Sequence, residues 1–189
     1  DGPFLEDFCL PKGKYARFGR MFVTALRVVF SGVILGTLAS SYLTLTHVQL
    51  CDSEYHCVSF AGWVQFTTFT RWCWMIQGVY HLGCLFASSL FPLHDREDAS
   101  RWHGGTKATT ARVLYVLYQI SWAMAMLVTI VTYTVLVPAA VVLPMPAHKS
   151  GAIKVLLSWQ GHVMHLLNTI MMVTDYRVTG KRVNLRDFS

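Results

Sequence analysis

The sequence has few charged side chains, and this scarcity narrows its class. Charged residues make up 14% of the 189 residues, against about 25% in ordinary soluble domains. A soluble fold of this size could not cover its surface with so little charge. A disordered chain or a coiled coil would carry more charge and fewer aromatic residues than the 13% found here. The sequence therefore indicates a chain that lies in a lipid bilayer.

A basic patch is also missing, although the formal net charge is +6. A nucleic acid partner requires Lys and Arg gathered with aromatic residues on one exposed surface. In this sequence the basic residues instead separate apolar runs. We therefore expect membrane lipids as partners and no nucleic acid. Other membrane subunits are expected as partners if the chain is an accessory subunit of a larger complex.

The sequence has few cysteines, and because their number is odd they cannot all form disulfides with one another. Of the five cysteines, only Cys51 and Cys57 lie close together outside the apolar runs. They could form a disulfide if their side of the membrane is an oxidising compartment.

Apolar side chains are abundant, at 53%, and they form four long runs. A helix needs about 20 such residues to cross a bilayer, and open strands cannot satisfy their backbone groups in lipid. We therefore predict an all-α integral membrane helical bundle with at least four transmembrane helices, as a single transmembrane domain over residues 1–189. The predicted spans are residues 21–46, 61–92, 113–138 and 153–175.

Lysine and arginine are distributed unevenly between the loops. The N-terminal segment, the loop after the second span and the C-terminal tail hold four each, whereas residues 46–60 hold none and residues 139–154 hold two. Short loops rich in these residues stay on the side where the protein is made. Both termini are therefore expected in the cytosol or the mitochondrial matrix. The endoplasmic reticulum and the mitochondrial inner membrane both fit, and the choice stays open.

The first span contains Gly32 and Gly36, a spacing of small residues that lets another helix approach closely. Glycine is common in membrane helices. We therefore favour packing inside the bundle over dimerisation.

Polar side chains at membrane depth are concentrated in the second and fourth spans. Ionisable groups in hydrocarbon are costly, so those present usually face the bundle interior and mark a function or a specific pair. On the fourth span His162, His165 and Asn168 follow one helix face at three-residue spacing. On the second span, Thr68 and Arg71 share a face.

Three kinds of site compete for these residues. His162 and His165 could bind a metal ion, but no further ligand completes the set. His81 with either of them could bind haem, an interpretation open to most proteins of this kind. Thr68 with His165 or His162 could form a nucleophile and its base. From composition alone, structural hydrogen bonds are favoured for each residue, and we expect no metal ion and no cofactor.

A family resemblance singles out the third kind of site. It rests on Gln65-Phe66-Thr67-Thr68-Phe69-Thr70-Arg71-Trp72, on residues 127–133, and on His162-Val163-Met164-His165 followed by Asn168 and Asp175. This set resembles the rolling stone and androgen-induced membrane protein family, some of whose members are intramembrane threonine hydrolases of fatty acid esters. The resemblance implies Thr68 as nucleophile and His165 as base.

The supporting residues follow from this assignment. Asn168 or His162 would orient the imidazole of His165, and Arg71 would stabilise an oxyanion or hold a substrate carboxylate. The alternative function is a non-catalytic accessory subunit of a larger membrane complex, for example a respiratory or other energy-transducing one. Such a subunit would use the fold for packing and lipid binding.

Overall fold

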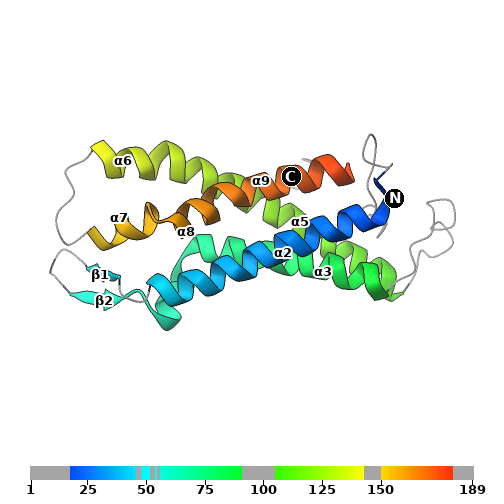
Figure 1. Cartoon of the computed structure of the whole chain (residues 1–189), viewed down its shortest axis with the longest axis horizontal. Coiled ribbons are helices and arrows are strands. Elements are labelled where there is room, and N and C mark those ends of the chain that lie inside the picture. The colour runs from blue at the N-terminus through cyan, green and yellow to red at the C-terminus, as the bar shows by residue number, and fades with distance from the viewer. Residues whose placement is uncertain are drawn as a thin grey trace. The chain divides into compact units, whose positions relative to one another are not determined.

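The computed structural model is mostly helical, which confirms the expected predominance of helix. It describes residues 18–45, 48–51, 54, 56–90, 105–142 and 150–180, and Figure 1 labels the elements. Two helical stretches in this part of the chain are long and apolar enough to cross a membrane, Gly19–Thr44 and Thr106–Ala139.

The second predicted span is divided by a break in the backbone. It begins with a 3-10 helix, η3 (Gly62–Thr67), and continues as α3 (Phe69–Leu90). Thr68 lies between them in an extended conformation, with φ −82° and ψ 129°. Thr68 and Arg71 therefore do not share a face of one α-helix, contrary to the sequence prediction. Neither Gly nor Pro stands at or beside Thr68, so the sequence carries no breaker signal at this position.

The first and third predicted spans are long helices. The first is α2 (Gly19–Thr44). The third begins as α5 (Thr106–Val131), widens into the π-helix η5 (Thr132–Leu136) and ends as α6 (Val137–Val142). Pro138 lacks an amide N–H, and its ring crowds the carbonyl four residues earlier. The widened turn just before it accommodates the ring, so the helix continues past Pro138, where the sequence predicts its end.

The fourth predicted span is built from two helical pieces. The first is α7 (Ser150–Leu156), and the second runs through α8 (Trp159–His162), the π-helix η7 (Val163–Leu167) and α9 (Asn168–Thr179). Ser158 caps the second piece, its hydroxyl accepting from the Gly161 amide at 3.0 Å. A Cβ at Gly161 would lie 2.6 Å from the Val155 carbonyl oxygen. Only glycine therefore fits this close approach.

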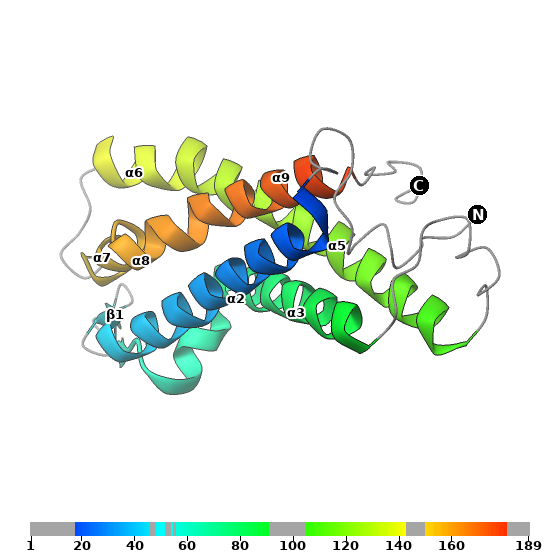
Figure 2. The same ribbon diagram turned by 45° about the vertical axis from the view of Figure 1, so that its right-hand side comes forward.

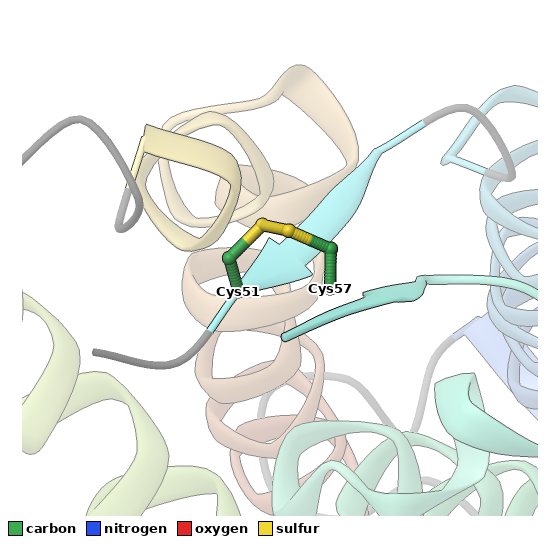
Figure 3. Close-up of a disulfide and its surroundings, with 2 residues drawn as sticks. All are labelled: Cys51 and Cys57. Carbon is green, nitrogen blue, oxygen red and sulfur yellow. A yellow bond between two sulfur atoms is a disulfide. The ribbon is translucent and has the colours of Figure 1, made fainter. Parts of the chain in front are cut away.

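A short hairpin follows α2, and the sequence does not predict it. Strands β1 (Gln49–Cys51) and β2 (Cys57–Ser59) pair antiparallel, with Cys51 opposite Cys57. A disulfide joins these two cysteines, as Figure 3 shows. Strand β1 contacts α7, beside which it lies in Figure 2.

The chain divides into two compact units, each containing parts of the long helices. The first unit comprises the described residues within Asp1–Gly32, Ile76–Trp122 and Met171–Ser189, and the second those within Val33–Met75 and Ala123–Ile170. Gly32 and Gly36 are exposed on α2, and a Cβ built on either meets no described atom within 4 Å. The expectation that these glycines pack inside the bundle is therefore wrong for the described residues.

Candidate functional site

The two histidines of the fourth predicted span hydrogen-bond to consecutive residues of another helix. In the second unit the Thr132 hydroxyl lies 3.1 Å from His165 Nδ1, and the Tyr133 hydroxyl lies 3.0 Å from His162 Nδ1. Thr132 and Tyr133 begin η5, while His165 lies in η7 and His162 directly precedes it. The two π-helical turns thus meet through two pairs of hydroxyl and imidazole. π-helical turns occur frequently at functional sites.

Threonines one helical turn away reinforce this junction. The Thr129 hydroxyl hydrogen-bonds to the His165 carbonyl oxygen and lies 2.8 Å from the Thr169 hydroxyl. Thr169 in turn donates to the Ala125 carbonyl at 2.9 Å. These bonds fix the height of His165 against α5, and therefore the position of its imidazole beside Thr132.

Thr68, the nucleophile that the resemblance implies, has a different hydrogen-bond partner. Its hydroxyl donates to the Gln65 carbonyl oxygen at 3.1 Å, and its side chain is half-buried. No hydrogen bond joins Thr68 to His165 among the residues that the structure describes. Among the described residues, the hydroxyl that hydrogen-bonds to the His165 ring is that of Thr132.

Arg71 is fully enclosed in the second unit. Only 2% of the residue is exposed. Its Nη2 donates to the Ser41 hydroxyl at 2.8 Å, and the guanidinium lies over the Phe60 ring, 5.7 Å from its centre. Ser41 comes from the last turn of α2, so Arg71 links α3 to α2.

A second polar cluster lies in the first unit, and the sequence interpretation misses it. The sequence interpretation names Asp175 only within the family resemblance and assigns no partner to Arg27. In the structure, Arg27 Nη2 lies 3.4 Å from Asp175 Oδ1, and the Tyr80 hydroxyl donates to Asp175 Oδ2 at 2.7 Å. All three residues are buried. In the sequence, the one sign of this cluster is a pair of opposite charges near the ends of two apolar runs, 148 residues apart.

The remaining candidates are buried close to these two clusters. Asn168 is fully buried at the start of α9, three residues after His165. In the first unit His81 is fully buried, its ring 5.2 Å from the Phe30 ring and 5.0 Å from the Tyr80 ring. Within the described ranges no group of three or more His, Cys, Asp or Glu residues could hold a metal ion.

The chemistry of the second unit is that of a hydroxyl next to an imidazole. Such a pair can transfer a proton from oxygen to nitrogen, the step that activates a nucleophile. Comparison with protein-family models, with curated proteins and with solved structures gives no match for this chain. Any conclusion about function therefore rests on the geometry of the site residues.

Proposed function

We propose that this chain is a multi-pass membrane protein that hydrolyses lipid esters, with His165 as the general base. The hydrogen bond between the Thr132 hydroxyl and His165 Nδ1, 3.1 Å long, carries the proposal. That distance lies within the roughly 2.6–3.2 Å that proton transfer requires. The resemblance to threonine hydrolases supports His165 as base and points to Thr68 as nucleophile, whereas the geometry favours Thr132.

The membrane part of the proposal comprises at least four spans. Large apolar side chains are exposed along α2 and α5, among them Met21, Leu35, Leu127 and Ile130. In water such a surface would be unfavourable, whereas in a bilayer it faces acyl chains. Membrane lipids are then both the surroundings and the source of substrate, in the endoplasmic reticulum or the mitochondrial inner membrane.

The reaction proceeds in two steps. The Thr132 oxygen attacks the acyl carbonyl while His165 Nδ1 accepts its proton, and the alcohol leaves with that proton. Water then attacks the acyl-threonine, with His165 taking a proton from water and returning one to the Thr132 oxygen. The products are a carboxylic acid and an alcohol. His165 accepts at Nδ1 only when Nε2 carries the hydrogen, so the mechanism requires that tautomer.

A fluorophosphonate probe tests the proposal directly. The wild-type protein in detergent should become covalently labelled, and peptide mass spectrometry should place the label on Thr132. His165→Ala and Thr132→Val should each lose labelling and ester turnover by at least about 100-fold, the usual scale of general base catalysis. Thr68→Val is the matched control and should keep both. A label on Thr68 would instead support the nucleophile that the resemblance implies.

An accessory subunit is the second candidate, and the burial of the same residues favours it. Thr132 and His165 are only 2% and 8% exposed, as expected of polar side chains whose role is to hold helices together in lipid. If the wild-type protein never labels, and mild detergent extraction recovers it only within a larger assembly, this candidate replaces the hydrolase.

A further inference from the structure

The enclosed guanidinium of Arg71 has no counter-charge in the described part of the chain. No ion pair joins it to a carboxylate among those residues. Its contacts are the neutral Ser41 hydroxyl and the face of Phe60, and the Ser41 hydroxyl itself donates to the Leu38 carbonyl. Arg27 in the first unit contrasts with it, because Asp175 lies beside that guanidinium.

An unpaired buried guanidinium is unfavourable, and its bonding capacity is largely unused. Removing an ion from water is costly unless an opposite charge and hydrogen bonds compensate it. The guanidinium carries five N–H donors in a planar fork that matches the oxygens of phosphate and carboxylate groups. The arrangement around Arg71 therefore fits an anionic group supplied from outside the chain.

The position of Arg71 indicates where that group comes from. Arg71 lies in the first turn of α3, and Ser41 in the last turn of α2, close to the hairpin. Beside these residues Trp72 and Tyr42 are 54% and 46% exposed. Exposed Trp and Tyr at the ends of apolar helices mark the level of the lipid headgroups. Basic pockets between transmembrane helices bind anionic headgroups on the cytoplasmic or matrix side, and a guanidinium offers the same chemistry at the headgroup level of the opposite side.

A neighbouring amide adds an acceptor. Gln65 is fully buried and donates through Nε2 to the carbonyl of Phe60, the residue over whose ring Arg71 lies. Its Oε1 has no hydrogen-bond donor among the described residues. A headgroup that carries both a phosphate and a hydroxyl can use the two side chains together.

We propose that Arg71 binds the phosphate of an anionic phospholipid at the hairpin end of the second unit, with Gln65 accepting from a headgroup hydroxyl. Phosphatidylglycerol has this chemistry. The inference depends on the membrane location but not on ester hydrolysis, so loss of probe labelling leaves it intact.

Thermal unfolding of the full chain in a neutral detergent tests the proposal. Added phosphatidylglycerol should raise the unfolding midpoint of the wild type by about 5 °C at saturation, since a ligand stabilises the state that it binds. Phosphatidylcholine, which has no net charge, and inorganic phosphate should produce less than half of this rise. Equal rises with phosphatidylglycerol and phosphatidylcholine would overturn the proposal, and an equal rise with inorganic phosphate would overturn a lipid as the source.

Variants locate the effect. Arg71→Gln should abolish the phosphatidylglycerol response, and Arg71→Lys should keep part of it, because lysine retains the charge but not the fork. Arg20→Gln is the matched control, since Arg20 is exposed on the first turn of α2, and it should respond as the wild type does. If the Arg71 variants respond like Arg20→Gln, the site is elsewhere. If the Arg71 variants fail to fold, Gln65→Leu replaces them as the test of the site. This variant should weaken the phosphatidylglycerol response at least twofold.

Discussion

At the scale of single residues, several buried polar side chains in the described ranges join two helices. Asp175 illustrates this best, because each of its carboxylate oxygens has a partner, Arg27 on one and Tyr80 on the other. An ion pair removed from water contributes little net stability when complete. Breaking it by removing one partner is costly, because the remaining charge stays buried.

Asp175→Asn should therefore lower the free energy of unfolding by about 3–5 kcal/mol. The substitution keeps the shape of the side chain but removes the negative charge that lies 3.4 Å from Arg27 Nη2. Unfolding titrations in mixed detergent, followed by tryptophan fluorescence, measure the change. Glu54→Gln is the control, since that carboxylate is exposed, 3.8 Å from His56, and its loss should cost under about 0.5 kcal/mol. Similar losses in the two variants would contradict the assigned role.

A double substitution separates charge from packing. Arg27→Met combined with Asp175→Leu removes both charges and keeps apolar volume, so it should be more stable than Asp175→Asn. A double variant less stable than the single one would mean that the cluster acts through more than its charges.

At the scale of elements, the informative features are breaks and widened turns, and these are what the sequence conceals. Long apolar runs predict the helices because burial in lipid requires a satisfied backbone. The extended Thr68, the step between α7 and α8, and the two π-helical turns depend on local contacts that hydropathy does not record. The candidate site was predictable only in part. His162 and His165 stand out as ionisable residues in an apolar run, whereas their partners Thr132 and Tyr133 enter only within the segment 127–133 of the family resemblance, with no role assigned.

Gly161 provides a test of one such break. Gly161→Ala should lower the unfolding midpoint markedly, because the new Cβ would lie 2.6 Å and 2.7 Å from two backbone carbonyl oxygens, and backbone cannot easily move aside. Gly36→Ala is the matched change on α2, where a Cβ meets nothing within 4 Å. That substitution should leave the midpoint unchanged or raise it slightly, because alanine favours helix. A lower unfolding midpoint for Gly36→Ala than for Gly161→Ala would contradict the close backbone approach at Gly161.

At the scale of the whole molecule, the distribution of basic residues predicts the orientation in the membrane. The loop of residues 46–60 has no Lys or Arg, so it should lie opposite both termini. The hairpin within that loop carries the disulfide, which fits an oxidising side. The distribution of Lys and Arg predicts this orientation without knowledge of the fold, whereas the pairing of β1 with β2 is seen only in the structure.

Thiol labelling in sealed vesicles checks this orientation. After mild reduction, a membrane-impermeant maleimide should label Cys51 and Cys57 from the side opposite Cys9. Cys73 and Cys84 are buried and should stay unlabelled until the protein is denatured, which makes them an internal control for folding. Labelling of Cys9 and Cys57 from the same side would rule out the predicted orientation.

The disulfide has one more consequence, because it closes a small covalent ring around residues 52–56. A protease that cuts inside the ring severs the main chain, but the sulfur bridge still holds the two pieces together. A nicked molecule therefore migrates as one band on a non-reducing gel and as two after reduction, one of which ends near residue 54. Because protease added outside a vesicle cuts only exposed loops, the same pair of gels also reports which way the ring faces.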